Sequence, residues 1–186
     1  MLAGGGSRRF GSDKTRALID GRPLLDLAVS AVAEAVDEVV VVGPWAPDGV
    51  RHVLEPERGQ GPLAGLVHGL RSVSVGHVLV VGGDHPLLVP TLLRLLLDHR
   101  HDADAVVPLR DGEPEPLVAC YRRDVALAAA DALLAEGRRK LMLLLDAVTV
   151  HEIDEVTWRQ VDPDGRSFED VDTPGDLTSL KRVLDG

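Results

Sequence analysis

The first residues of the chain combine glycines and cations in a way that suits an anionic ligand. Gly4, Gly5 and Gly6 have no side chains, so their backbone can approach a bound group closely and present several N–H donors. Arg9, Lys14 and two further arginines add positive charge against a single acid in the same stretch. Such a loop is typical of phosphate binding, and the phosphates of a nucleotide are the first candidates.

Neither of the two best-known phosphate loops has this spacing. A P-loop carries its lysine directly after the second glycine, whereas two residues separate Gly11 from Lys14 here. The dinucleotide fingerprint Gly-x-Gly-x-x-Gly is also broken, because Arg9 stands where its third glycine belongs. The spacing therefore indicates a phosphate loop of a different kind.

The composition limits the class of the protein and its partners. With 186 residues, 45% hydrophobic and 27% charged, the chain suits one well-cored domain, which we expect to span 1–186. A formal net charge of −10 and 3% aromatic residues argue against nucleic acid or a membrane surface as a partner. Cys120 is the single cysteine, so a disulfide framework is excluded. With no signal peptide pattern and no apolar run of membrane-spanning length, we expect a cytoplasmic protein.

Apolar, β-branched runs alternate with amphipathic stretches along the chain. Strands are predicted over residues 38–43, 77–83, 104–109, 117–121 and 148–153. Helices are predicted over residues 23–35, 62–71, 91–100 and 124–136, with a last helix after Pro174. This alternation predicts an α/β fold with an open, mostly parallel sheet and helices on both faces. Ligands of such sheets bind outside the carboxyl ends of the strands, so the glycine loop and the segments 59–66 and 82–88 should share one edge.

The motifs resemble those of the molybdenum cofactor guanylyltransferases, often called MobA proteins. LAGGGSRRFGSDK is similar to the family signature Leu-Ala-Gly-Gly-x-Ser-x-Arg-Met-Gly-x-Asp-Lys and departs from it at Phe10, where Met is usual. The likeness covers essentially the whole chain in the same order, through GRPLL, EPERGQGPLAGL, GGDHPLL, PLVACYRRD, LLAEGRRKLMLLL and FEDVDTPGDL. It implies a Rossmann-like nucleotidyltransferase fold and transfer of GMP from GTP to the molybdopterin cofactor, with release of pyrophosphate.

The resemblance also implies roles for individual residues. Asp84 would bind Mg²⁺, and Asp172, where relatives carry Asn or Asp, would help to orient the same ion. Glu55 stands where the family commonly has a shorter Asp that contacts the nucleotide. The catalytic set would be Arg9, Lys14 and Asp84, and the nucleotide-binding set Leu2, Ala3, Gly4, Gly5, Lys14, Glu55 and Asp84.

The expected chemistry agrees with these residue types. A phosphomonoester oxygen is already ionised near neutral pH, so the reaction needs no Ser, Cys or His nucleophile. It needs positive charge around the α-phosphate and the departing pyrophosphate, which Arg9, Lys14 and a carboxylate-bound Mg²⁺ can supply.

Several alternatives remain open at this level. The protein could be a molybdopterin cytidylyltransferase, a guanylyltransferase for another phosphorylated acceptor such as phospholactate, or a non-catalytic nucleotide-binding adaptor that meets other molybdenum cofactor biosynthesis or delivery proteins. Asp172 precedes Thr173 and Pro174, so it could instead cap a helix. His99 and His101 lie near two aspartates, but residues two apart do not share a helix face, which favours a polar helix end over a metal site.

The start of the chain differs from the family pattern. Relatives usually have an apolar strand before the glycine motif, whereas only Leu2 and Ala3 follow Met1 here. We therefore expect a truncated first strand at the centre of the sheet, with exposed ladder groups on its neighbours and less core around it.

Overall fold

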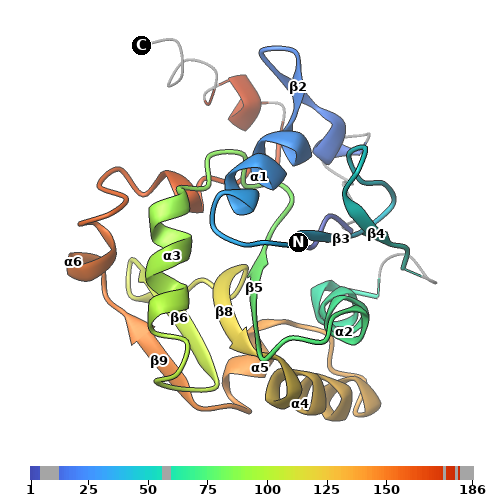
Figure 1. Cartoon of the computed structure of the whole chain (residues 1–186), viewed down its shortest axis with the longest axis vertical. Helices are drawn as coiled ribbons and strands as arrows, with labels where there is room; N and C mark the ends of the chain where they lie inside the picture. The colour runs from blue at the N-terminus through green and yellow to red at the C-terminus, as the bar shows by residue number, and fades with distance from the viewer. Residues whose placement is uncertain (5–12, 56–59, 174, 179, 181–186) are drawn as a thin grey trace.

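The computed structural model describes residues 1–4, 13–55, 60–173, 175–178 and 180, and its centre is a twisted sheet (Figure 1). At one side of the sheet, β3 (Val40–Val42) and β4 (Arg51–Val53) pair in parallel. At the other side, β8 (Val118–Arg122) pairs antiparallel with both β5 (His77–Val81) and β6 (Ala105–Arg110). The edge strand β9 (Val150–Ile153) runs parallel to β6.

The N-terminal residues join these two halves of the sheet. Leu2 forms parallel bridges to Val42 in β3 and to Gly82 just after β5. The order across the sheet is therefore β4, β3, the N-terminal segment, β5, β8, β6 and β9. Because β8 is the one antiparallel member of this order, and the short β7 adds only a hairpin to β6, the predicted mostly parallel α/β sheet is confirmed.

Helices cover both faces of the sheet, as the sequence predicts (Figure 1). One face packs against α2 (Pro62–Ser72), α4 (Arg123–Ala135) and α5 (Met142–Leu145). The other face packs against α1 (Leu24–Ala33) and α3 (Pro90–Asp98). Alternate residues of each strand enter the two cores, since side chains alternate across a sheet. In β8, Ala119 and Tyr121 face α4, whereas Val118 and Cys120 face α3.

Several short elements complete the fold, and the sequence prediction did not include them. Two Asp-Gly turns close small hairpins: Asp20 and Gly21 join β1 (Leu18–Ile19) to β2 (Arg22–Pro23), and Asp111 and Gly112 join β6 to β7 (Glu113–Pro114). All four turn residues have positive φ, between 49° and 80°, which suits the primed turns of tight hairpins. The remaining short helices are η1 (Lys14–Arg16), α6 (Glu155–Trp158) and η2 (Arg166–Phe168).

Leu2 and Ala3 lie between β3 and β5 and form backbone hydrogen bonds on both sides. The Leu2 N–H donates to the Val81 carbonyl at 2.9 Å, and the Ala3 N–H donates to the Val42 carbonyl at 2.7 Å. Glycines on both neighbouring strands make room for this segment, since a side chain at Gly43 or Gly83 would crowd Ala3. The segment is therefore held firmly between β3 and β5 although it is short.

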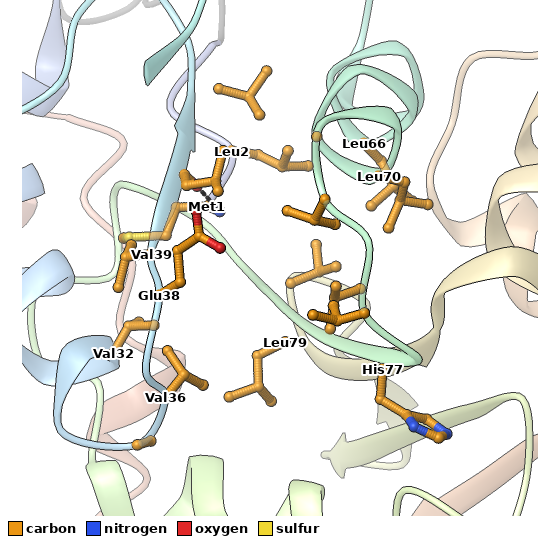
Figure 2. A pocket seen from close by; sticks show the side chains of 18 of the residues that line it. Met1, Leu2, Val32, Val36, Glu38, Val39, Leu66, Leu70, His77 and Leu79 are labelled. Atoms are coloured by element: carbon orange, nitrogen blue, oxygen red, sulfur yellow. Dashed lines mark hydrogen bonds between the residues drawn. The ribbon is translucent and has the colours of Figure 1, made fainter. Parts of the chain in front are cut away.

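Beyond Met1, the space between β3 and β5 is an apolar cavity of about 440 Å³ (Figure 2). Figure 2 shows Val36 and Val39 on one side of this cavity, Leu66 and Leu70 on the other, and Leu79 between them. Side chains that face a void lose dispersion contacts on that side. The core is therefore incompletely packed between β3 and β5.

Among the described residues, no helix has the length and apolar character that crossing a membrane requires.

Candidate active site

The helical turn η1 carries Lys14 to the carboxyl-end edge of the sheet. Asp13 caps this turn by accepting from the Thr15 N–H at 3.1 Å and from the Thr15 hydroxyl at 2.6 Å. The Trp45 indole N–H donates to the same Thr15 oxygen at 2.8 Å. The Arg16 guanidinium lies 4.4 Å from the centre of the Trp45 ring. These contacts fix the backbone from which the Lys14 side chain extends.

Asp84 lies in the loop that follows β5, with its side chain folded back over Gly82. A side chain at Gly82 would collide with both Asp84 and His85, so glycine is required there by this close approach. The His85 ring is 6% exposed, and its Nδ1 lies 3.2 Å from Asp84 Oδ1. The Asp84 carbonyl accepts from the Val171 N–H at 3.1 Å, which ties the C-terminal segment to this loop.

The charges around Asp84 keep it ionised. Its burial disfavours the carboxylate, but the hydrogen bond and charge of His85 and the ammonium of Lys14 outweigh that effect. Together they hold the pKa of Asp84 well below its ordinary value. Asp84 is therefore a carboxylate at neutral pH.

Lys14 connects two carboxylates from distant parts of the chain. Its Nζ lies 2.5 Å from Asp84 Oδ2 and 2.6 Å from Asp172 Oδ1. Burial of Lys14 acts to lower its pKa, but the charge of Asp84 and the hydrogen bond to Asp172 outweigh this and raise the pKa above its usual value. The ammonium is therefore kept protonated beside the two acids.

Asp170 completes the acidic group. Asp170 and Asp172 are exposed on either side of the fully buried Val171, so both residues lie at the surface. One oxygen each from Asp84, Asp170 and Asp172 lies within 4.8 Å of the other two. Partial desolvation and the charge of Asp172 raise the pKa of Asp170. Three carboxylates beside one ammonium leave a surplus of negative charge, and their oxygens are the ligands that hard divalent cations such as Mg²⁺ prefer.

The sequence left open whether Asp172 caps a helix, but Thr173 and Asp176 form the cap of the turn that follows. The Thr173 N–H donates to Asp176 Oδ2 at 2.7 Å, and the Asp176 N–H donates to Thr173 Oγ1 at 3.2 Å. This reciprocal pair is a capping box at the start of the helical turn that follows. The Asp172 carboxylate contacts Lys14 instead, so the interpretation of Asp172 as a helix cap is wrong.

Glu55 lies beside the start of the glycine loop. A side chain at Gly4 or Gly65 would collide with the Glu55 carboxylate, so this carboxylate occupies the space between Gly4 and α2. Its burial raises the pKa of Glu55, while the nearby charge of His68 acts in the opposite direction. Leu2 also reaches α2, where it lies close to Gly65.

The structure thus brings together two groups of the residues singled out from the sequence. Lys14, Asp84 and Asp172 form one group, and the segment Leu2–Gly4 with Glu55 forms the other. Gly5 and Arg9 lie outside the described residues. The sequence-based set of site residues included neither Asp170 nor His85. The alternation Asp-Val-Asp at 170–172 is the signal that could have revealed Asp170.

Comparison with known proteins identifies the family of this chain. Residues 1–150 match the model of the MobA-like NTP transferase domain. The chain belongs to the MobA-like NTP transferase family. The probable molybdenum cofactor guanylyltransferase of Chloroflexus aggregans is 34% identical over 99% of this chain and 93% of that protein. The protein of the same description from Deinococcus radiodurans is 35% identical over 97% of this chain and 91% of its own length.

A solved structure extends this result to the fold. Molybdopterin-guanine dinucleotide biosynthesis protein A from Archaeoglobus fulgidus superposes with a TM-score of 0.82 and 26% identity. The match covers 99% of this chain and 96% of that one. The MobA-like fold therefore extends over nearly the whole of both chains.

Proposed function

We propose that this protein transfers GMP from GTP to the phosphate of the molybdenum-molybdopterin cofactor. An oxygen of the acceptor phosphate forms a bond to the α-phosphorus, and the bond from that phosphorus to the bridging α–β oxygen breaks. Pyrophosphate leaves with the bonding electron pair, and the product is the guanine dinucleotide cofactor. The observation that carries the proposal is the Lys14 ammonium held between Asp84 and Asp172 at the carboxyl-end edge of a MobA-like sheet. The names of the relatives support the choice of nucleotide and acceptor.

Lys14 is the described cation best placed for the phosphates. Its ammonium is held protonated, and its partners Asp84 and Asp172 lie on different segments that meet only at this edge. An ammonium aimed at a triphosphate stabilises the charge that passes to the leaving pyrophosphate. Lys14 would therefore contribute to nucleotide binding and to the transition state together, and Arg9 of the same loop would add a second cation.

The acidic group fits a Mg²⁺ ion. Three carboxylates, from Asp84, Asp170 and Asp172, supply oxygen donors close to one another, and Lys14 alone does not balance their charge. These residues would hold the ion, and Mg²⁺ when bound would neutralise charge on the phosphates. His85 positions the Asp84 carboxylate through its ring nitrogen, and the low pKa of Asp84 keeps it available as a ligand.

Glu55 supports guanine as the base. Its carboxylate lies against the backbone of Gly4, at the loop to which we assign the nucleotide. Guanine presents a ring N–H and an amino group side by side, and one carboxylate can accept from both. Cytosine presents a single amino donor beside an acceptor, so it would leave one carboxylate oxygen without a partner. Such an unpaired polar group disfavours the wrong base.

The test is pyrophosphate release by the purified chain with GTP, Mg²⁺ and molybdopterin cofactor as acceptor. We expect release that depends on the acceptor and is much faster with GTP than with CTP, ATP or UTP. Asp131→Asn, an exposed acid paired with Arg71 far from this edge, provides a matched control variant with normal turnover. Faster release of pyrophosphate with CTP than with GTP would show that the protein is a cytidylyltransferase instead. Binding of GTP without any acceptor-dependent release would favour the non-catalytic alternative.

A further inference from the structure

A second cluster of metal-ligating side chains lies at the opposite end of the sheet from Asp84. The described part of the chain contains two such clusters, the acidic one above and the group His99, Asp102 and His151. His99 follows the last residue of α3, and His151 is the second residue of β9. The loop that leads from α3 into β6 places them together, because the Asp104 and Ala105 N–H groups both donate to the Thr149 carbonyl just before β9.

The strand register turns His151 toward α3. His151 pairs with Val106 in the parallel ladder between β9 and β6, and paired residues point to the same face of a sheet. Val106 packs in the core cluster that contains the leucines of α3. The His151 side chain therefore lies on the α3 side, where α3 ends and His99 begins the following loop.

The three side chains converge at this position. One ligand atom from each lies within 4.8 Å of the other two, and His151 Nε2 lies 3.9 Å from Asp102 Oδ2. The rings of His99 and His151 are nearly parallel, with an interplanar angle of 13° and centroids 5.4 Å apart. The cluster therefore offers two imidazole nitrogens and one carboxylate oxygen to a common point.

A backbone hydrogen bond fixes the tautomer of His99. Its Nδ1 lies 3.0 Å from the Leu95 carbonyl oxygen, and since a carbonyl can only accept, Nδ1 carries the proton. In the neutral ring with this tautomer, Nε2 carries the lone pair that can bind a metal ion. Ligating histidines typically hold the second ring nitrogen on a carbonyl or carboxylate in this way, which fixes the tautomer and the ring plane.

The spacing of the donors is close to what one ion needs. Ligands about 2.0–2.1 Å from a tetrahedral Zn²⁺ lie about 3.4 Å apart. Donors that are now up to 4.8 Å apart would need to approach by roughly 1.5 Å. The side chains of His151 and Asp102 are 38% and 49% exposed, so rotation about their χ angles can supply that movement.

We propose that His99, Asp102 and His151 bind a divalent transition-metal ion, and that Zn²⁺ is the ion their donor set fits. Imidazole with one carboxylate suits zinc, cobalt or nickel, whereas Mg²⁺ prefers a shell of oxygens. Water completes the coordination. The bound ion ties the loop after α3 to the edge strand β9, and this site does not depend on the function proposed for the acidic edge.

The test is calorimetric titration of untagged protein with Zn²⁺ in excess Mg²⁺, which would compete for the oxygen donors of the acidic cluster. We expect one equivalent of Zn²⁺ to bind to the wild-type chain. His99→Ala and His151→Ala should each weaken that binding by more than the about 10- to 100-fold that losing an outer-shell partner costs. His101→Ala is the matched control, because His101 contacts the His77 ring instead and should retain the site. Asp84→Asn should also retain it.

Co²⁺ provides a second measurement with the same variants. Imidazole coordination of low symmetry gives Co²⁺ a more intense visible absorption than the aquated ion has, and we expect this stronger absorption in the wild-type chain and its loss in His151→Ala. Asp102→Asn, altered at a half-exposed side chain, serves as a further ligand variant if His151→Ala fails to fold. Undiminished Zn²⁺ binding in the His99 and His151 variants would overturn the proposal. An equal loss in His101→Ala or Asp84→Asn, or no binding by the wild-type chain, would overturn it too.

Discussion

The two ends of the central sheet carry different kinds of metal-ligating side chains. At the carboxyl ends of the strands, Asp84, Asp170 and Asp172 offer oxygens beside the ammonium of Lys14. At the opposite end, near the start of β9, the second group consists of the imidazoles of His99 and His151 and the carboxylate of Asp102. The two groups lie at opposite ends of the sheet, since Asp84 follows the end of β5 and His151 lies near the start of β9.

Because the two ends of the sheet offer different donor atoms, they suit different metal ions. Oxygen donors with a surplus of negative charge favour a hard ion such as Mg²⁺, which also binds phosphates. Imidazole nitrogens favour a transition-metal ion such as Zn²⁺. The acidic end is also tied together across the chain, because Lys14 and Asp172 are 158 positions apart. We therefore expect changes at the acidic end to affect the reaction, and changes at the histidine end to affect Zn²⁺ binding.

Asp84→Asn should have the largest effect and should separate the two ends most clearly. The substitution keeps the shape of the side chain and removes the charge that holds Lys14 and would hold Mg²⁺. We expect turnover to fall by at least about 10²–10³-fold, since charge in the transition state is left without compensation. GTP affinity should change far less. The measurement is pyrophosphate release against Mg²⁺ concentration, with Asp131→Asn as control, and normal turnover would show that the catalytic centre lies elsewhere.

Lys14→Ala should weaken GTP binding and turnover together. A charge-assisted hydrogen bond to phosphate contributes about 1.5–3 kcal/mol, so we expect about a 10- to 100-fold loss in GTP affinity. The fold should remain, because Thr15 and Asp13 hold η1 independently of the lysine side chain. Calorimetric titration with GTP is the measurement, and Arg16→Ala on the same turn is a suitable comparison. Unchanged GTP affinity in Lys14→Ala would show that the phosphates of GTP do not bind at this edge of the sheet.

Asp172→Asn should have a smaller effect than Asp84→Asn. The Asp172 side chain is half exposed, and an amide oxygen can still accept from Lys14 and face a cation. We expect turnover to fall by less than about 10-fold, with a higher Mg²⁺ requirement. The same pyrophosphate assay measures this. A loss as large as that of Asp84→Asn would show that the three acids contribute equally.

Glu55→Gln should have the smallest effect and should change selectivity more than rate. The amide keeps the size of the side chain beside Gly4 but offers guanine only one acceptor. We expect the ratio of kcat/KM for GTP over CTP to fall about 10-fold. Competition between the two nucleotides in one assay measures that ratio directly. An unchanged ratio of kcat/KM for GTP over CTP would show that residues other than Glu55 select the base.

Much of the fold could be predicted because its main elements have strong periodicity. The runs before Gly43 and Gly82 are apolar on both faces, which is typical of buried strands, and Pro62 and Pro90 stand at the first turn of their helices. The strand β4 was missed because its residues are largely exposed and polar. The hairpins at Asp20 and Asp111 were missed although Asp-Gly is a strong turn signal.

Site residues that belong to a sequence motif could be predicted, whereas contacts between two distant segments of the chain could not. Lys14 and Asp84 each stand within a recognisable motif, and Asp172 follows from a third. The meeting of His99 with His151 depends on the register between β6 and β9, and no local pattern contains that register. The position of His85 against Asp84 depends likewise on the turn above Gly82.

The most direct test of the proposed reaction follows the label from GTP into product. Wild-type protein is incubated with Mg²⁺, molybdopterin cofactor and GTP labelled either at the α- or at the γ-phosphate. The account predicts that the α-label enters the dinucleotide product and that the γ-label leaves in pyrophosphate. Transfer of the γ-label to the acceptor, or absence of the α-label from it, would contradict the proposed transfer of GMP.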